Sequence, residues 1–408
     1  MQRLTPTDER ELSALFEDAS GAGRPLELIG RGSKRNYGRP QQVEAEVSLE
    51  AFSGIGFYEP EELVLSAGAA TPMVEIESQL DAHKQMLAFE PMNLAPLLSG
   101  SLEGPRPDSL GGVVACNLSG PRRPRSGAAR DHVLGLAGVN GAGACFKTGG
   151  RVVKNVTGYD LCKLLSGSLG TLAALTEVTV KVLPRPEKIR TLLYFGLGLE
   201  QANALFVKAL GSAYDVSAAA FLPETLAAGS AVDLISDARA SVTALRLEGP
   251  EPSVMARQAG LTALLSSFGK PGEELHASRS LAFWREIRDC HPFVERNARS
   301  IWRLSLPPSR AAEVVAALSA KPEDCFLDWG GGLLWLARSG AETSTEDLDA
   351  VLGRVGGFGT LVAGETASRA ALPAFLPQVS GRTALSRRIK EALDPKGILN
   401  PGRLYAGI

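Results

Sequence analysis

The chain has 408 residues, enough for two or three domains, and its 43 Lys and Arg residues against 45 Asp and Glu residues give a formal net charge of −2. This balance argues against a general nucleic-acid-binding surface. No run of about 18 uncharged apolar residues could cross a bilayer, and the acid-rich N-terminus lacks the apolar stretch of a signal peptide. We therefore expect a cytoplasmic protein with no transmembrane segment and no nucleic-acid partner.

The five cysteines and four histidines are scattered along the chain. No C-x-x-C pair is present, which argues against an iron–sulfur cluster within this chain. No two histidines have the spacing of helical metal ligands, so we predict no metal site. The 44 glycines concentrate within 98–172 and again near 330 and 356, where the main chain can approach a ligand closely.

The first part of the chain alternates between predicted strands and helices. A helix is expected over 7–19, with Thr5 or Thr7 as its N-cap. Further elements are expected at 26–29 (strand), 63–67 (strand), 72–82 (helix) and 171–182 (strand). The strand at 26–29 runs into a polar loop at 31–37, whose backbone N–H groups and two adjacent cations could bind an anion. A solvated turn would explain that loop as well.

From about residue 187 the pattern changes to strands and amphipathic helices without glycine-rich loops. Strands are expected at 191–197 and 241–247, and helices at 201–210, 253–267 and 309–318. This pattern favours an α+β domain built around its own sheet. A helix over 382–393 and a turn rich in proline and glycine follow. We therefore expect three parts, 1–183, 187–375 and 376–408.

Three segments carry the chemistry. No G-x-G-x-x-G and no G-x-x-x-x-G-K-[ST] is present, which excludes a Rossmann dinucleotide fingerprint and a Walker loop. What remains is the loop at 31–37, the segment S-L-G-G at 109–112, and the run at 150–161 followed by G-S-L-G-T-L at 167–172. Structural glycine turns would account for any one of them alone.

In order and spacing these segments resemble the flavoproteins of the vanillyl-alcohol oxidase type. The runs V-K-N-V-T-G-Y-D-L-C-K-L at 153–164 and R-D-H-V-L-G-L at 130–136 are more narrowly similar to the FAD-binding subunit of bacterial glycolate oxidase. The resemblance covers roughly 1–183 and the C-terminal tail. It implies an α+β fold, in which a two-subdomain FAD-binding domain of the PCMH type carries an α+β cap domain and a tail that returns to the flavin domain.

The resemblance also implies which residues bind FAD. The first loop would wrap the pyrophosphate, S-L-G-G would line the cofactor, G-S-L-G-T would hold the adenine and ribose side, and the tail motif would return to the site. The residues so implied are Arg31, Gly32, Ser33, Lys34, Arg35, Asn36, Ser109, Leu110, Gly111, Gly112, Gly167, Gly170, Thr171, Val178 and Asn400. Because the segments matched to the cofactor contain no histidine and only Cys116 and Cys162 as cysteines, we expect non-covalent FAD, with covalent attachment as the alternative.

The cap region departs from related α-hydroxy-acid dehydrogenases. Those proteins carry the motif H-G-D-G-N-L-H, whose imidazoles bind substrate or metal and handle a proton. Here 328–335 reads D-W-G-G-G-L-L-W, with Trp329 and Trp335 at the histidine positions. Tryptophan can neither accept a proton nor ligate a metal. Asp328 is a candidate base, although a turn residue or an ion-pair partner would explain it as well.

Two functions follow. In the first, the chain is an FAD-binding subunit of a multi-subunit glycolate (2-hydroxy acid) oxidase, auxiliary to a catalytic flavoprotein subunit and an iron–sulfur subunit, through which the complex could lie at the inner face of the membrane. In the second, it is a self-sufficient FAD-dependent dehydrogenase, with Lys154, Arg303 or Arg338 binding the substrate carboxylate. The tryptophans favour the first, and no catalytic residue is assigned. A cofactor-free scaffold would require an empty 31–36 loop.

A short basic patch follows the S-L-G-G segment. Arg122, Arg123, Arg125 and Arg130 place four cations within nine residues. A solvated loop or a contact with FAD phosphate would explain them. We hypothesise instead that they dock on an acidic partner surface, because the first loop already supplies cations for the pyrophosphate.

Overall fold

The computed structural model describes residues 2–102, 107–151, 158–294, 300–339, 344–376 and 380–405.

Near the N-terminus a three-stranded parallel sheet has the order β1-β3-β2. Its strands are β1 (Gln2–Leu4), β2 (Leu26–Ile29) and β3 (Ala45–Ser48). Helix α1 (Glu9–Ala22) packs on them through Leu12, Phe16 and Ala19. The predicted threonine N-cap is wrong: the Asp8 carboxylate accepts hydrogen bonds from the first-turn N–H groups, so the helix begins after Asp8.

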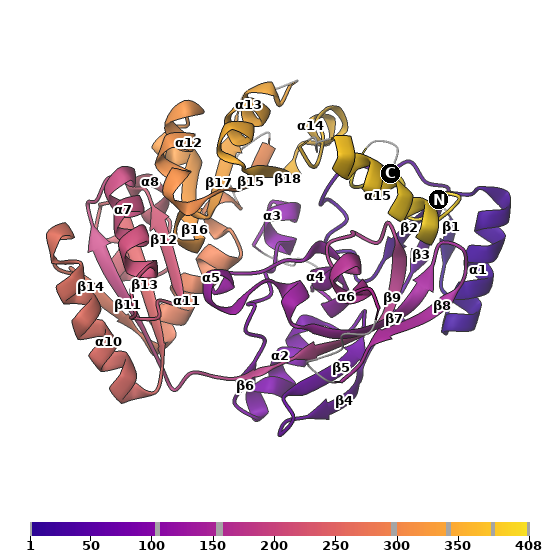
Figure 1. The fold of residues 1–408 in the computed structure, drawn as a ribbon, viewed down its shortest axis with the longest axis horizontal. Helices are drawn as coiled ribbons and strands as arrows, with labels where there is room; N and C mark the ends of the chain where they lie inside the picture. The colour runs from indigo at the N-terminus through magenta and orange to yellow at the C-terminus, as the bar shows by residue number, and fades with distance from the viewer. Residues whose placement is uncertain are drawn as a thin grey trace.

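A second, antiparallel sheet has five strands in the order β4-β5-β9-β7-β8. Its strands are β4 (Ile55–Glu59), β5 (Val64–Gly68), β7 (Val133–Asn140), β8 (Cys145–Gly149) and β9 (Ala173–Lys181). The helices around it are α2 (Met73–Ala82), α3 (Ala95–Ser99), α4 (Leu110–Cys116), α5 (Arg123–Ser126) and α6 (Leu161–Leu165). The short strands β6 (Gln85–Met86) and β10 (Leu183–Pro184) pair with each other. Together the two sheets and these helices form the central and right-hand part of Figure 1. We call this unit, which the sequence resemblance predicts to bind FAD, the flavin domain.

The remaining large unit is a cap built on an eight-stranded antiparallel sheet. Its order is β14-β11-β13-β12-β16-β17-β15-β18. The strands are β11 (Lys188–Phe195), β12 (Ala218–Leu222), β13 (Val242–Gly249), β14 (Glu273–His276), β15 (Ser300–Ser305), β16 (Cys325–Asp328), β17 (Leu333–Arg338) and β18 (Phe358–Gly364). The helices are α7 (Leu199–Leu210), α8 (Glu224–Ala227), α9 (Asp233–Ser236), α10 (Glu251–Leu264), α11 (Ala277–Arg288), α12 (Ala311–Ala317), α13 (Glu346–Val355) and α14 (Thr366–Ala371).

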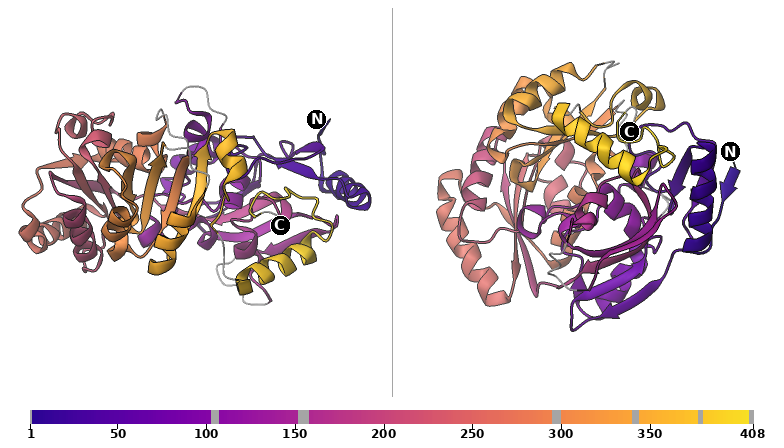
Figure 2. Two further views of the ribbon diagram at one scale, coloured as in Figure 1. Left: turned by 90° about the horizontal axis from the view of Figure 1, so that it is seen from above. Right: turned by 45° about the vertical axis from the view of Figure 1, so that its right-hand side comes forward.

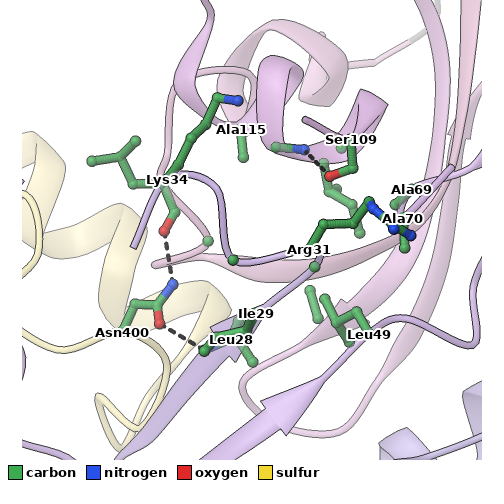
Figure 3. Close-up of a pocket in the computed structure, with 18 of the residues that line it drawn as sticks. Leu28, Ile29, Arg31, Lys34, Leu49, Ala69, Ala70, Ser109, Ala115 and Asn400 are labelled. Carbon is green, nitrogen blue, oxygen red and sulfur yellow. Dashed lines mark hydrogen bonds between the residues drawn. The ribbon is translucent and has the colours of Figure 1, made fainter. Parts of the chain in front are cut away.

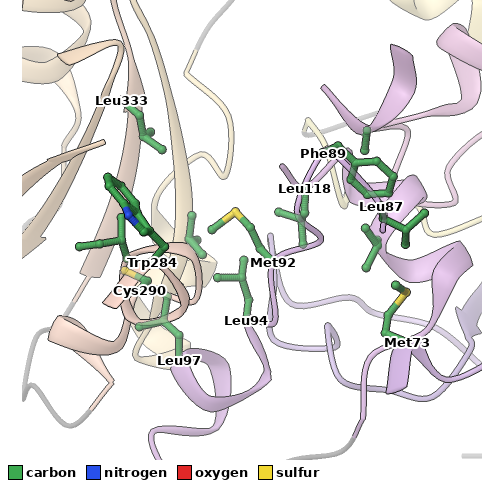
Figure 4. Packing of buried hydrophobic residues seen from close by; sticks show 14 of the residues in the cluster. Met73, Leu87, Phe89, Met92, Leu94, Leu97, Leu118, Trp284, Cys290 and Leu333 are labelled. Atoms are coloured by element: carbon green, nitrogen blue, oxygen red, sulfur yellow. The ribbon is translucent and has the colours of Figure 1, made fainter. Parts of the chain in front are cut away.

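The two faces of the cap sheet bury different partners, because side chains alternate along each strand. Trp302 and Leu304 of β15 belong to a core shared with α7, α10, α12 and α13. The opposite face contributes to a core that continues into the flavin domain. Figure 4 shows this second core, with Met92, Leu94 and Leu97 facing Trp284, Cys290 and Leu333. The cap is therefore packed on its neighbour through an apolar interface.

The C-terminal tail returns to the flavin domain, as Figure 2 shows. Helix α15 (Ser380–Leu393) ends beside Asp394, whose carboxylate accepts hydrogen bonds from the N–H groups of Ile398 and Leu399. Leu399 then pairs in parallel with Leu26 of β2. The buried Lys390 ammonium donates to the Thr171 carbonyl at 2.6 Å and to the Asp394 carboxylate at 2.7 Å. This buried contact ties the tail to the glycine-rich loop at 167–171.

Within the described ranges, no helix is long and apolar enough to cross a membrane. Nor do these ranges contain a group of three or more His, Cys, Asp or Glu residues arranged to hold a metal ion.

Candidate functional site

A cavity lies where the loop after β2, the start of α4, the loop after α6 and the tail meet; we call it the nucleotide cavity (Figure 3). Many of the residues implied by the sequence line it, namely Arg31, Gly32, Ser33, Lys34, Arg35, Ser109, Gly111, Gly112, Gly170 and Asn400. The structure thus brings together residues from four segments that lie far apart in the chain. Residues that the sequence did not single out also line the cavity, namely Glu27, Leu28, Ile29, Gly30, Leu49, Ala69, Ala70, Ala115, Cys116, Leu169, Ala173, Ala174, Leu175 and Arg403.

Five implied residues lie outside the lining. Leu110 and Val178 are fully buried in the core. Thr171 is buried and donates its hydroxyl hydrogen to the Ser168 carbonyl, and the Gly167 N–H donates to the Val114 carbonyl. The Asn36 amide donates to the Leu98 carbonyl and accepts from Arg369. These contacts hold the loops that surround the cavity.

The loop after β2 carries three cations with different surroundings. The ammonium of Lys34 lies 2.6 Å from the Asp108 carboxylate, and both side chains are buried. Arg35 turns toward the carboxylates of Glu27 and Glu46, at 2.5 and 3.1 Å. The Nε of Arg31 is buried and, among the residues that the structure describes, has no hydrogen-bond partner. A buried donor without a partner is costly, so Arg31 is suited to an anionic ligand in the cavity.

Helix α4 presents its N-terminus to the cavity. Ser109 is the N-cap, and its hydroxyl accepts a hydrogen bond from the Gly112 N–H at 3.3 Å. Gly111 is required by packing, since a Cβ there would lie 2.7 Å from the Ala69 Cβ and 2.8 Å from the Ala69 carbonyl oxygen. The main chain of α4 therefore lies directly against the residue that follows β5.

The tail completes the cavity through Asn400 and Arg403. The Asn400 side chain accepts from the Leu28 N–H at 2.9 Å and donates to the Leu169 carbonyl at 2.8 Å, which links the tail to two loops of the flavin domain (Figure 3). Arg403 donates to the Lys34 carbonyl at 2.7 Å, while its Nε is buried without a partner in the described part of the chain. Arg403 immediately follows the N-P-G motif, and that position was the only signal for it in the sequence.

The lining fits FAD. Two buried guanidinium Nε atoms without partners, on Arg31 and Arg403, suit the negatively charged pyrophosphate. The glycines at 111 and 112 and the alanines at 69 and 70 provide close apolar backbone for a planar ring. Cys116 also lines the cavity, and burial raises the pKa of its thiol to about 11, so the thiol is neutral at pH 7.

The tryptophans at the imidazole positions are both built into the fold. Trp329 donates its indole N–H to the Gly120 carbonyl of the neighbouring domain at 3.0 Å. The guanidinium carbons of Arg123 and Arg303 lie 4.5 and 4.8 Å from the centre of its ring. Trp335 is fully buried on β17 and stacks on Phe326. Trp329 is therefore a packing group at the domain interface, whereas the buried Trp335 indole nitrogen has no hydrogen-bond partner in the described ranges.

Asp328 and the histidines offer no general base in the nucleotide cavity. Asp328 is buried at the end of β16, where it accepts a hydrogen bond from the Trp329 N–H, and burial raises the pKa of its carboxyl group to about 7. It caps the turn that carries Trp329 and does not line the cavity. All four histidines lie within the described ranges, and none is among the residues that line the cavity.

Of the three candidate carboxylate-binding cations, the structure describes Arg303 and Arg338. Arg338 pairs with Asp347. Arg303 lies on β15 opposite Trp335 and has a buried Nε with no partner in the described ranges. Lys154, with the rest of 152–157, lies outside the described residues.

The hypothesis that the basic patch docks on a partner is wrong for Arg122. Its guanidinium is buried, donates to the Glu248 carboxylate of the cap at 2.6 and 2.8 Å, and lies 3.2 Å from Glu90. Arg246 of β13 contacts the same two acids. We call Glu90, Arg122, Arg246 and Glu248 the domain seam, because these side chains join the flavin domain to the cap.

Comparisons with known proteins agree with this geometry. A family model described as an FAD binding domain matches residues 2–149, and a model described as the C-terminal domain of FAD linked oxidases matches residues 376–404. The glycolate oxidase subunit GlcE of Escherichia coli (strain K12) is 34% identical over 94% of this chain and 93% of its own length. The chain belongs to the GlcE family. The resemblance predicted from the sequence motifs is confirmed.

The chain also has more distant similarities to other proteins. The D-lactate dehydrogenase of Archaeoglobus fulgidus is 24% identical and covers 98% of this chain and 90% of its own length. The crystal structure of p-cresol methylhydroxylase with substrate bound superposes with a TM-score of 0.66 at 14% identity, over 98% of this chain and 88% of that one. The predicted fold, an α+β PCMH-type FAD-binding domain with a cap, is confirmed.

Proposed function

We propose that this chain is the FAD-binding subunit of a multi-subunit oxidase for glycolate or a related 2-hydroxy acid, and that it does not oxidise substrate itself. It would hold FAD non-covalently beside a catalytic flavoprotein subunit and an iron–sulfur subunit. The complex would be cytoplasmic and could lie at the inner face of the membrane through those partners. The similarity to the GlcE subunit supports the assignment to such a complex.

The single observation that supports the auxiliary role is that tryptophans occupy the two positions where related dehydrogenases have histidines. Trp329 and Trp335 are fixed by an indole hydrogen bond and by aromatic stacking, and no histidine lines the nucleotide cavity. Removing the hydroxyl proton of a 2-hydroxy acid requires a positioned base. Since Asp328 caps a turn outside the cavity, the described residues supply none there.

The residues of the cavity have binding roles in this proposal. Arg31 and Arg403 would contact the pyrophosphate of FAD, and the backbone around Gly111 and Gly112 would lie against the cofactor. Asn400 would act indirectly, by holding the loops at Leu28 and Leu169 together. When bound, FAD supplies a two-electron acceptor and donor. As predicted from the sequence, we assign residues 1–183 to the FAD-binding domain, 187–375 to the cap and 376–408 to the segment that returns to the FAD-binding domain.

A second candidate is the self-sufficient dehydrogenase. It is favoured by Arg303, whose buried Nε has no partner among described residues at the interface where a substrate carboxylate would lie. The similarity to a D-lactate dehydrogenase adds support. Under this alternative, the candidate base would be Asp328, whose carboxyl group interacts electrostatically with Arg303.

The visible absorption spectrum of the purified FAD-loaded chain, recorded anaerobically before and after addition of glycolate, separates the two candidates. We expect the oxidised-flavin bands to persist with glycolate and to bleach with dithionite, which controls for a reducible flavin. Bleaching by glycolate would make this chain catalytic and would overturn the auxiliary role. Acid precipitation should release all the FAD into the supernatant, whereas yellow precipitate would demonstrate covalent attachment.

A further inference from the structure

A second cavity lies between the flavin domain and the cap, on the side formed by α2, β6, β11 and α11; we call it the interdomain cleft. Its volume is about 460 Å³, within the range of roughly 300–1,000 Å³ for small-molecule sites. It shares no lining residue with the nucleotide cavity. A ligand bound there would therefore not occupy the FAD site.

Positive charge dominates the cleft. Six arginines and one lysine line it against four carboxylates, in a chain whose overall net charge is −2. Two of these arginines, Arg122 and Arg246, belong to the domain seam and are already paired. Arginine is suited to organic anions because its planar fork matches carboxylate and phosphate groups. Of the other cations that line the cleft, Arg285 on α11 is the one without an ion pair in the described ranges.

One face of α11 presents apolar and cationic groups together. Leu281, Trp284, Arg285 and Arg288 follow the spacing of a single helical face and all line the cleft. Leu281 is 43% exposed although its neighbour Trp284 is buried. The Arg285 guanidinium has no ion pair within the described ranges, whereas Arg288 directs its Nε and one terminal nitrogen to Asp289. Arg285 interacts electrostatically with Glu77, which also lines the cleft, but forms no ion pair with it. An exposed leucine beside this arginine suits a ligand with an apolar body and an anionic group.

The opposite wall has two further cations, and each forms an ion pair with a carboxylate. Arg185 pairs with Asp81 at 2.8 Å, and Lys188 pairs with Glu251 at 3.0 Å, each through partly exposed side chains. Such exposed pairs are weak and can be exchanged for a ligand anion at little cost. Ile189 and Met86 continue the apolar surface between them.

We propose that the interdomain cleft binds a small organic anion with an apolar body, with Arg285 as its main charged contact and Leu281 as its apolar contact. This site is independent of the proposed function, because its ligand would bind whether or not the chain oxidises a hydroxy acid. A carboxylate, phosphate or sulfonate group on the ligand would meet the guanidinium of Arg285. The apolar body would cover the exposed leucine.

The test uses the FAD-loaded chain and the fluorescent sulfonate 8-anilinonaphthalene-1-sulfonate as the probe. We expect saturable binding of one probe molecule per chain. Reversal of the charge in Arg285→Glu should weaken this binding about tenfold, which is the loss of one charge-assisted contact. Arg285→Gln should give an intermediate loss. The matched control is Arg279→Glu, on the same helix but outside the cleft, which should bind the probe as the unmodified chain does.

The uncharged analogue N-phenyl-1-naphthylamine lacks the sulfonate group, so its binding reports the apolar contact with Leu281 without the charged contact with Arg285. Its binding should be unchanged by Arg285→Glu and should be lost in Leu281→Asp. The proposal is overturned by non-saturable binding of the sulfonate probe, by less than twofold weakening in Arg285→Glu, or by an equal effect of Arg279→Glu. FAD content and circular dichroism of every variant show whether the fold is intact. The glycolate bleaching experiment is unaffected by any of these outcomes.

Discussion

The nucleotide cavity and the domain seam both bury arginines, but the arginines have opposite surroundings. In the seam, Arg122 and Arg246 face Glu90 and Glu248, and the two guanidinium groups engage both carboxylates. In the cavity, Arg31 and Arg403 each keep a buried Nε with no partner in the described part of the chain. The seam arginines are neutralised by carboxylates of the protein itself, whereas the cavity arginines are suited to bind an anionic ligand.

The seam also determines how the carboxylates titrate. Burial alone would raise the pKa of Glu248, but Arg246 and Arg122 outweigh it and lower the pKa to about 2. The pKa of Glu90 is also lowered, because the same two arginines outweigh its burial. Both groups are therefore ionised in the folded protein wherever their pairs persist. A buried pair of this kind is strongly destabilised when one partner is removed.

The largest expected effect concerns the tail that brings Arg403 to the cavity. Asp394→Ala removes the carboxylate that pairs with buried Lys390 and accepts two backbone N–H groups. We expect a loss of about 3–5 kcal/mol in the free energy of unfolding, together with weaker FAD binding. Denaturant unfolding and FAD content measure both. Glu391 is an exposed acid on the same helix, so Glu391→Ala should change neither the free energy of unfolding nor FAD binding. If both variants have the same stability and FAD content, the buried contacts of Asp394 do not hold the tail in place.

The next effect tests the seam. Glu248→Gln should destabilise the protein by about 3 kcal/mol at pH 7, because Arg122 and Arg246 lose a buried partner. Since the folded pKa of about 2 lies below the ordinary value of 4.5, this contribution is complete above about pH 5 and disappears as the pH falls through about 2. The stability difference between the two proteins should therefore shrink on acidification.

Glu251→Gln is the matched control for the seam, since Glu251 forms an exposed pair with Lys188. It should cost less than about 1 kcal/mol and show no comparable pH dependence. A difference between Glu248→Gln and the unmodified protein that persists unchanged at pH 3 would contradict the pairing described for Glu248.

The smallest expected effect tests the close approach at the nucleotide cavity. Gly111→Ala places a Cβ 2.7 Å from the Ala69 Cβ, so α4 must shift away from the end of β5. Overpacking of this kind costs about 1–3 kcal/mol, which we expect to see as weaker FAD binding in a fluorescence titration. Gly21→Ala on α1, where a Cβ meets nothing within 4 Å, should leave FAD affinity unchanged. Undiminished affinity in Gly111→Ala would show that α4 does not form the FAD surface.

Sequence patterns predicted local elements and motif segments well where local chemistry decides them. The strand predicted at 171–182 is β9, and the helix predicted at 382–393 is α15. The N-cap of α1 was misplaced, because Asp8 competes with the two threonines and its carboxylate reaches two N–H groups. The helix α4 was not predicted from S-L-G-G, since paired glycines have low helix propensity and only packing against β5 makes the helix stable.

The sequence did not predict the direction in which individual side chains of a segment point. Arg122 and Arg123 are adjacent in one basic patch, yet Arg122 is buried in the seam and Arg123 lies over the Trp329 ring. Leu110 belongs to the S-L-G-G segment, and Val178 to the strand after G-S-L-G-T-L, but both point into the core. A motif identifies the segment that approaches a ligand, whereas the register of a strand or helix decides which of its side chains face the cavity.

The sequence by itself determined the family, the α+β class, the loops that surround the nucleotide cavity and the replacement of both imidazoles by tryptophan, because these depend on residue type and order. Only the tertiary structure decided which cations are paired and which are free. That outcome depends on acids that are distant in sequence, such as Glu248 for Arg122 and Asp108 for Lys34. Charge pairing acts over a few ångströms in space, and only the fold brings such partners together.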